Sequence, residues 1–542
     1  MTVRLLAAAS LAALVATGAL AQGATHPETG EALAENQTFT WRLLDEVPTL
    51  DPALIEDVDS SHIARQLFEG LYNQDPEGNI TPGVALDHTV SEDGLTYTFN
   101  LRPEAKWSNG ESVTANDFVY AWRRAADPAT ASNYAWYIEL MKIENAGAVI
   151  AGEMTPDQLG VRAVDDQTLE VKLTQPIPYF PQMVTHTTTF PVPQAVIEQQ
   201  GDAWTQPGNM VGNGAYVLSE RVPQERTVVT RNENYWDNAN TVLDQVNFLV
   251  INDETQALTR YLADELDATD VPIGQFPRLS EEMPDQVHAV PLLCTYYYAV
   301  NMRDDAPEAL KDVRVREALN LAIDRDVIAN NILGAGQRPA YTLTHWATAG
   351  WEVPELPIAT MTQEERNARA QELLAEAGYG PEGEPLTFEI IYNTDQAHQQ
   401  LAVAIGQMWK QTLGIDTTLA NQEWQTFLDT RRDGNFEIAR AAWCADYNEA
   451  STFLDLMTSD NDANDSKYLN PEYDALLEQS RTAEDPLPLY QQAEEMLARD
   501  LPILPIYFYS KDFLLDAAIK GYPFENAQEN WYAKDMYRVA EG

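Results

Sequence analysis

The few cations of this chain are its most informative side chains for chemistry. Against 84 acidic and only 34 basic residues, Arg431, Arg432 and Arg440 lie within ten residues of one another, and His398 precedes them. Several aromatic residues are considered together with these cations: Tyr296, Tyr297, Tyr298, Trp424, Trp443 and Tyr447. Arginine and aromatic side chains are enriched on recognition surfaces, which suggests ligand binding. Core aromatics with surface arginines that balance local acid explain the same pattern, and composition alone favours this second interpretation.

Sequence motifs for catalysis are not found. The chain has no G-x-S-x-G, H-E-x-x-H, Walker A or C-x-x-C sequence. Two paired carboxylates could in principle hydrolyse a glycoside, but a chance pair among 84 acidic residues proves nothing. The sequence therefore predicts no catalytic residue and no cofactor.

One acidic run begins like a calcium-binding loop. Asp460, Asp462 and Asn464 have the spacing of the first three ligands. Asp465 then stands where the loop needs glycine, and Pro471 stands where the bidentate glutamate belongs. We expect a solvated loop here and no metal site.

The composition limits the class of protein. A formal net charge of −50 disfavours binding to nucleic acid or anionic lipid, because phosphate contacts need lysine and arginine. The 12 Trp, 24 Tyr and 15 Phe can fill cores, so disorder is not expected. At roughly 100–200 residues per domain, the length predicts three or four compact units. After the N-terminal segment, no apolar run reaches the roughly 18 residues typical of a membrane span.

The first 21 residues are typical of a secretory signal peptide. Arg4 is followed by the apolar stretch Leu5–Leu20, and small residues at Ala19 and Ala21 predict cleavage after Ala21. The alternative, an uncleaved membrane anchor, is disfavoured because the stretch is shorter than the roughly 20 residues of a span. No cysteine follows the predicted cleavage site, so no lipid anchor is indicated. We expect export to the periplasm.

The two cysteines, Cys294 and Cys444, take their meaning from this compartment. Disulfides persist in an oxidising compartment and not in the cytosol, so one bridge is plausible. Two buried thiols remain an alternative, and a metal or catalytic pair has little support from two isolated cysteines.

Alternating and helical patterns occur along the whole chain. Apolar residues at every second position predict strands over residues 95–101 and 169–173. Thr114 and Asp117 form a capping-box pattern that begins a predicted helix, and Pro128 ends it.

A second capping box opens a predicted helix at Thr362, and Gly378 ends that helix. The segment Leu386–Ala420 has the pattern strand, helix, strand, with Gly414 closing the helix, as in a βαβ unit. Mixed strands and helices over the full length predict an α/β architecture. Composition shows no domain boundary.

Several longer segments resemble a known family. The general pattern is carried by LDPALIED, WSNGESVTANDFVYAWRR, GNGAY, NYW and DVRVREALNLAIDRD. The more specific segments are LCTYYYAVN (293–301), NTDQAHQQLA (393–402), NQEWQTFLDTR (421–431) and ARAAWCADYNEASTF (439–453). In order and over nearly the whole mature chain, these are similar to the oligopeptide-binding members of extracellular solute-binding protein family 5, the peptide- and nickel-binding family of ABC importers.

This resemblance implies a periplasmic-binding-protein-like fold of type II, cluster C, with three lobes. Lobe I would be discontinuous, over residues 22–68, 193–293 and 511–542. Lobe II would be inserted as residues 69–192, and lobe III would be residues 294–510. The ligand would be enclosed between lobes I and III.

The resemblance also implies roles for individual residues. Asp446 corresponds to the aspartate that holds the terminal ammonium of a peptide, by a charge-assisted hydrogen bond. Arg440, Arg431 and His398 correspond to the cations that meet its terminal carboxylate, according to peptide length. A Cys294–Cys444 bridge is implied as well.

Further positions correspond to the lining of the ligand site. They are Tyr134, Asn393, Trp424, Trp443 and Tyr509, together with Glu56 and Val58 on the segment whose backbone pairs with an extended peptide. Two residues depart from the family pattern. Arg432 replaces a histidine, which leaves its role open, and Ala299 replaces an acidic residue near the binding region, which would change the preference for basic side chains or for length.

We therefore predict a periplasmic receptor and not an enzyme. It would capture short peptides in extended form with little side-chain specificity and deliver them to an inner-membrane ABC permease with its ATPase subunits. Monomer is the default of the family. One alternative keeps the fold and makes the protein a murein-peptide receptor. The alternative from another class is a secreted hydrolase of peptides or sugars.

Overall fold

The computed structural model describes residues 24–540. The predicted signal peptide, residues 1–21, lies outside the described residues. Within residues 24–540, no helix is both long enough and apolar enough to cross a membrane.

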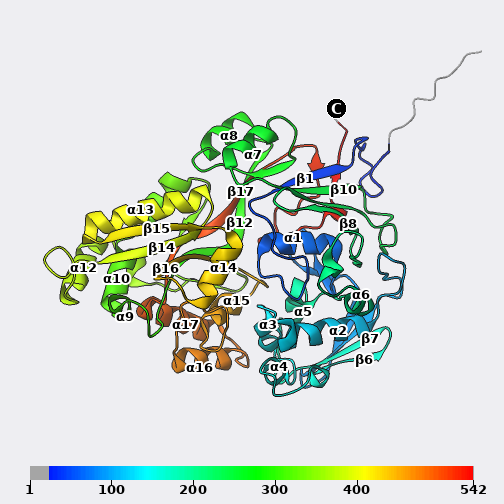
Figure 1. Cartoon of the computed structure of the whole chain (residues 1–542), viewed down its shortest axis with the longest axis horizontal. Coiled ribbons are helices and arrows are strands. Elements are labelled where there is room, and N and C mark those ends of the chain that lie inside the picture. Colours follow the sequence, from blue (N-terminus) through cyan, green and yellow to red (C-terminus); the bar gives the residue numbers. More distant parts are fainter. Residues whose placement is uncertain (1–23, 541–542) are drawn as a thin grey trace, which may run out of the picture.

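A mixed sheet of eleven strands forms the centre of the molecule (Figure 1). Its strands follow in the order β15 (Asp416–Gln422), β14 (Thr387–Asn393), β16 (Ile438–Cys444), β12 (Val287–Val300), β17 (Ile503–Leu515), β11 (Ala268–Asp270), β1 (Thr38–Leu43), β10 (Gln245–Val250), β9 (Arg226–Arg231) and β8 (Tyr216–Val222), while β13 (Arg338–Pro339) pairs with β17. The mixture of parallel and antiparallel pairs with helices confirms the α/β prediction.

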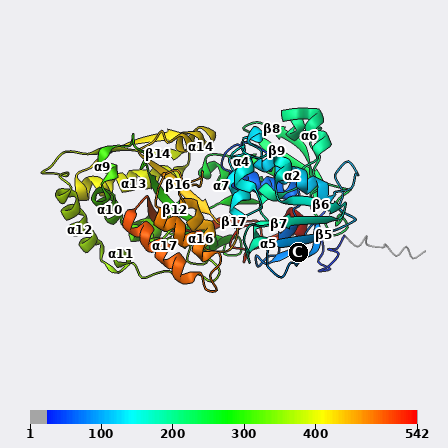
Figure 2. The ribbon, with the colours of Figure 1, turned by 90° about the horizontal axis from the view of Figure 1, so that it is seen from below.

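Two long strands, β12 and β17, run between the two halves of the molecule (Figures 1 and 2). The α9–α17 half contains the helices α9 (Glu308–Lys311), α10 (Val313–Leu321), α11 (Pro357–Thr360), α12 (Gln363–Glu376), α13 (Gln396–Leu413), α14 (Trp424–Asp433), α15 (Ser451–Leu454), α16 (Pro471–Ser480) and α17 (Leu487–Asp500). The antiparallel register of β12 with β17 shifts between Pro291 and Thr295, at the point where the strands pass from one half to the other.

The α1–α8 half contains the N-terminal helices and a second sheet. Its helices are α1 (Val58–Leu67), α2 (Ala115–Ala126), α3 (Ala135–Leu140), α4 (Ala146–Ile150), α5 (Phe180–Met183), α6 (Gln194–Gln200), α7 (Glu254–Tyr261) and α8 (Phe276–Glu282). Four antiparallel strands follow in the order β4 (Ala85–Val90), β5 (Thr96–Leu101), β7 (Thr168–Lys172) and β6 (Val161–Asp165). This half also contains two short strand pairs. They are β2 (Tyr72–Gln74) with β3 (Ile80–Pro82), and β18 (Ile519–Lys520) with β19 (Tyr537–Arg538).

The locally predicted elements are confirmed. β5 buries Tyr97, Phe99 and Leu101 on one face, as its alternation requires. The capping box at Thr114 opens α2, and the helix ends two residues before Pro128.

The predicted βαβ unit is confirmed as β14, α13 and β15, with β14 and β15 parallel. Gly414 follows the last residue of α13 with φ +72°, a left-handed conformation that glycine adopts without steric cost.

The tyrosine run of β12 is part of the core and does not line a surface. Tyr296 and Tyr298 pack into one apolar cluster, and Tyr297 packs into another on the opposite face of the sheet. Successive side chains of a strand point to opposite faces, so three consecutive aromatics can serve two cores. For these residues the interpretation as core aromatics is confirmed.

A disulfide joins Cys294 and Cys444. The two residues lie directly opposite each other on β12 and β16, so the sheet itself brings the sulfurs together. The bridge implied by the family resemblance is confirmed, and the alternative of two free thiols is wrong.

Replacing both cysteines with alanine is expected to lower the free energy of unfolding by about 2–5 kcal/mol. The bridge closes a loop of 150 residues, and the unfolded chain regains the entropy of that loop when the bridge is lost. Urea denaturation of the ligand-free protein measures the difference. Reduced wild-type protein should unfold at the same urea concentration as the variant, and a variant with the midpoint of oxidised wild type would contradict the prediction.

Candidate functional site

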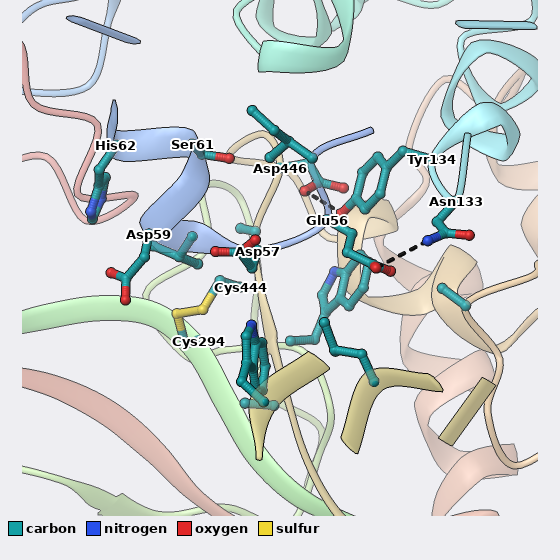
Figure 3. A pocket seen from close by; sticks show the side chains of 18 of the residues that line it. Glu56, Asp57, Asp59, Ser61, His62, Asn133, Tyr134, Cys294, Cys444 and Asp446 are labelled. Atoms are coloured by element: carbon teal, nitrogen blue, oxygen red, sulfur yellow. Dashed lines mark hydrogen bonds between the residues drawn. A yellow bond between two sulfur atoms is a disulfide. The ribbon is translucent and has the colours of Figure 1, made fainter. Parts of the chain in front are cut away.

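A cavity of about 750 Å³ lies between the two halves (Figure 3). Its walls come from the segment around α1, from residues 132–136, from β16 and α14, and from the crossing strands β12 and β17. All the residues assigned to the site from the sequence line it: Glu56, Val58, Tyr134, Cys294, Asn393, His398, Trp424, Arg431, Arg440, Trp443, Cys444, Asp446 and Tyr509. Glu56 and Tyr509, which are 453 positions apart in sequence, thus meet in one cavity.

Asp446 is a buried carboxylate with one unsatisfied oxygen. It lies two residues after β16 and is 9% exposed. The Tyr134 hydroxyl donates to its Oδ1 at 3.1 Å, as Figure 3 shows, and Nε2 of His186 lies 3.4 Å from the same atom. Its Oδ2 is buried and has no hydrogen-bond partner among residues 24–540.

Burial controls the protonation of this acidic group. It raises the pKa of Asp446 to about 7, although the Tyr134 hydroxyl and the charge of Arg65 both act to lower that pKa. The neighbouring imidazole supplies no charge, because burial lowers the pKa of His186 to about 3. Near neutral pH, Asp446 is therefore only about half ionised, and no charged cation of residues 24–540 lies within ion-pair distance of it. A group that brings a positive charge to Oδ2 would stabilise the ionised form.

Arg440 is the matching cation. It is 8% exposed, and its guanidinium donates to the Tyr509 hydroxyl at 2.9 Å and to Oδ1 of Asn393 at 3.4 Å. Its Nε is buried without a partner, and no carboxylate of residues 24–540 lies within ion-pair distance. A buried arginine held only by neutral groups is free to receive an anion.

Arg431, by contrast, already has a counter-ion. Its Nε donates to Oδ2 of Asp465 at 2.8 Å, and its Nη2 contacts the same oxygen. Asp465 belongs to the acidic run that resembled a calcium loop; it serves here as the partner of an arginine. In residues 24–540, no group of three or more acidic, histidine or cysteine side chains is arranged to hold a metal ion.

His398 is neutral in this arrangement. Burial lowers the pKa of its imidazole to about 3, and the charge of Arg440 adds to that shift. Its Nδ1 lies 3.3 Å from Oδ1 of Asp395, on the preceding turn. His398 can thus offer a hydrogen bond to a ligand, while the positive charge comes from Arg440.

The structure corrects the interpretation of Ala299. This residue is 1% exposed and pairs with Ala439 and Ile503 in neighbouring strands, inside an apolar cluster. It does not line the cavity. The loss of an acidic side chain at this position therefore does not change the wall that a ligand would contact.

Sequence reasoning missed three polar residues at the site. His186 contacts Asp446, and Asp465 neutralises Arg431. Asn133 donates to Glu56 at 3.0 Å. Only Asp465 carried a signal, as a member of an acidic run, and that run was attributed to solvent.

Asp446→Asn is expected to make the ligand-free protein more stable than wild type at pH 8, by about 4 kcal/mol for a rise of about three in the pKa of this carboxyl. The carboxyl of Asp446 has a pKa of about 4 in the unfolded chain and about 7 in the folded protein. At pH values between these two, the native state keeps a proton that the unfolded chain loses. Wild-type stability therefore falls as the pH rises through this window, whereas asparagine stays neutral. Melting temperatures of both ligand-stripped proteins at pH 5 and pH 8 measure this; a difference that is equal at the two pH values would contradict it.

Comparisons with known proteins identify the family. The family model "Bacterial extracellular solute-binding proteins, family 5 Middle" matches residues 79–465. The chain is 46% identical to the periplasmic murein peptide-binding protein MppA of Escherichia coli, over 97% of this chain and 98% of that one. It is 45% identical to the periplasmic oligopeptide-binding protein OppA of Salmonella typhimurium (99% and 98%). It is also 40% identical to the probable deoxycholate-binding periplasmic protein YgiS of E. coli (93% and 94%).

Solved structures confirm the fold. The E. coli murein tripeptide binding protein MppA superposes with a TM-score of 0.91 at 45% identity, covering 94% of this chain and 100% of that one. Haemophilus influenzae OppA in complex with RPPGFSPFR superposes with a TM-score of 0.89 at 40% identity (94% and 100%). The unliganded open form of MppA gives only 0.69 at 45% identity (95% and 99%). The arrangement seen here therefore differs from that open form.

Proposed function

Because the chain belongs to the bacterial extracellular solute-binding proteins of family 5, and its fold is the type II periplasmic-binding-protein fold, we propose that it is a periplasmic receptor for short peptides. It encloses a peptide in extended form and delivers it to an inner-membrane ABC permease. It performs no catalysis in this role. The family model and the relatives, all solute-binding proteins, support this proposal.

The observation that carries the proposal is a buried acid and a buried arginine, neither of which has a counter-ion among residues 24–540. Asp446 and Arg440 lie six positions apart along β16 and its extension, so their Cα atoms are at most about 20 Å apart. Each is buried, and an uncompensated buried charge is costly. A zwitterion with an ammonium at one end and a carboxylate at the other neutralises both.

The separation of the charges indicates the length of the ligand. An extended peptide advances at most about 3.3–3.6 Å per residue, so peptides of up to about five or six residues match this span. Side-chain tolerance follows from backbone pairing with the Glu56–Val58 segment, because main-chain hydrogen bonds are independent of sequence. A ligand with a carboxylate and no ammonium, such as a bile acid, would leave Asp446 without a partner.

The lobe boundaries are part of the proposal. Lobe I comprises residues 22–68, 193–293 and 511–542, lobe II comprises 69–192, and lobe III comprises 294–510. The breaks at 293 and 510 fall inside β12 and β17, near the register shift between Pro291 and Thr295, which supports them. Bending of these two strands would open the cavity, and the two arrangements of MppA support such a motion.

Two other functions remain to be separated from this one. The murein-peptide receptor shares the fold, and identities of 46% and 45% to the two kinds of relative do not discriminate between them. The secreted hydrolase has no support among these relatives, which are all solute-binding proteins.

Native mass spectrometry of protein exported to a periplasm tests the proposal. After denaturation, a ladder of mixed short peptides supports the receptor, and its masses give the preferred length. A single murein-derived peptide supports the specialised receptor, and a ligand without an amino group overturns the proposal. A bound peptide that is released as fragments after long incubation supports the hydrolase. The same spectrum gives the mature mass, which we expect to begin at Gln22, and shows whether the protein is a monomer.

A further inference from the structure

A second charged pair in the cavity wall joins the two halves. Arg432, near the end of α14, donates through Nη2 to both carboxylate oxygens of Glu56, at 2.8 Å each. Its Nη1 donates to Asp429 on the same helix at 3.0 Å. The Asn133 amide donates to Oε1 of Glu56 at 3.0 Å, and Figure 3 shows this hydrogen bond as a dashed line. Three segments distant in sequence therefore meet at the carboxylate of Glu56.

The pair lies at the surface of the cavity and remains accessible from it. Both residues line the cavity, and the side chains are 17% exposed for Glu56 and 37% exposed for Arg432. Glu56 is therefore an acid of the binding site whose charge is neutralised by a cation from the opposite half. Arg431 is neutralised by Asp465 in the same way. Within the described part of the chain, Arg440 is thus the one clustered arginine without a carboxylate partner.

We propose that the Glu56–Arg432 ion pair sets the charge preference of the site for one ligand side chain. The inference rests on the proposed function. Arg432 occupies the position in which a basic side chain of a peptide would meet Glu56, and this makes the wall neutral. Without Arg432 the wall is acidic and selects lysine or arginine; without Glu56 it is basic and selects aspartate or glutamate.

Competition explains why the intact pair is indifferent to charge. A basic ligand side chain can reach Glu56 only if it displaces a guanidinium that already makes two charge-assisted hydrogen bonds. A lysine ammonium would only replace one cation at Glu56 with another, and it would leave the Arg432 guanidinium without its Glu56 partner, so the exchange brings no gain. An acidic ligand side chain faces the same obstacle at Arg432, because Glu56 would lose its partner in a partly desolvated site.

Titration calorimetry of ligand-stripped protein tests the pair. The probes are trialanine peptides in which lysine, glutamine or glutamate replaces one alanine, at each of the three positions in turn. Arg432→Gln is expected to prefer lysine to glutamine about tenfold at one position, a difference of about 1.4 kcal/mol. Glu56→Gln is expected to prefer glutamate to glutamine about tenfold at that same position, while wild type stays within about threefold for both comparisons.

The comparison uses the ratio of the affinities of two peptides for the same variant. A change that affects closure of the cavity for every peptide cancels in this ratio. Breaking the pair also removes a link between the halves, but this weakens all peptides alike. The exchange variant Glu56→Arg with Arg432→Glu keeps a pair and should restore the wild-type ratios. Asp429→Asn, which removes the other partner of Arg432, should leave them unchanged. Melting temperatures identify any single variant that does not fold. In that case the exchange variant is compared with wild type instead.

The proposal is overturned if the two single variants shift charge preference at different positions or in the same direction. It is also overturned if wild type already prefers lysine tenfold. A folded wild-type protein that binds none of the glutamine peptides contradicts the proposed function itself, which is a different result from binding without a charge switch.

Discussion

Asp446→Asn is expected to lower the affinity for peptides with a free amino terminus at least a hundredfold. The side chain keeps its size, but the carboxylate that would receive the ammonium is lost. Breaking one partner of a buried ion pair costs about 3–5 kcal/mol, which corresponds to roughly 10²- to 10³-fold or more in affinity. Oδ2 of Asp446 is buried and has no partner in residues 24–540, so no other group shares this role.

Titration calorimetry with trialanine on ligand-stripped protein measures the loss. N-acetylated trialanine is the chemical control: wild type should bind it weakly, and the variant should bind it no worse than wild type does. Asp462→Asn is the matched variant, because Asp462 is an exposed aspartate at the rim of the same cavity. Unchanged affinity of Asp446→Asn for free trialanine would refute the assignment of the ammonium.

The stability prediction for this variant separates lost recognition from misfolding. A variant that binds a hundredfold less tightly and yet melts above wild type at pH 8 cannot owe its defect to unfolding. Binding sites commonly retain destabilising groups of this kind, because function requires them.

Arg440→Gln is expected to lower the affinity for peptides with a free carboxyl terminus by at least about thirtyfold. Arg440 has only the hydroxyl of Tyr509 and the amide of Asn393 as close partners. The ligand carboxylate would therefore be its main source of opposite charge. Charged hydrogen bonds of this type, when one partner is truncated in a desolvated site, cost about 2–5 kcal/mol.

C-terminally amidated trialanine checks the assignment, since it should bind wild type and Arg440→Gln with similar, low affinity. The matched control removes the neighbouring arginine together with its acid, as Arg431→Gln with Asp465→Asn. This double variant leaves the net charge unchanged and should weaken trialanine at least tenfold less than Arg440→Gln does. If the double variant lost as much affinity for trialanine as Arg440→Gln or more, the terminal carboxylate of the peptide would be assigned to Arg431 instead.

Local structure followed from the sequence because it depends on local signals. Alternation over residues 95–101 predicted β5, and the capping box at Thr114 predicted the start of α2. The segment Leu386–Ala420 predicted a βαβ unit that the sheet contains. Periodicity reports burial directly, since a strand buries every second residue and a helix buries one stripe. The resemblance to family 5 then identified residues that all line one cavity.

The electrostatic state of those residues was decided only by the tertiary structure. Nothing local distinguishes the three clustered arginines. Yet Arg431 pairs with Asp465 and Arg432 pairs with Glu56, whereas Arg440 has no carboxylate partner among residues 24–540. Ala299 illustrates the same limit for packing, because the face of β12 on which it lies turns it into the core. The sequence determined the α/β elements and the group of residues that meet in the site, and it predicted export to the periplasm. Which charge is free, and which proton is retained, depends on distances and burial between segments far apart in the chain, because Coulomb energy and desolvation act through space and not along the sequence.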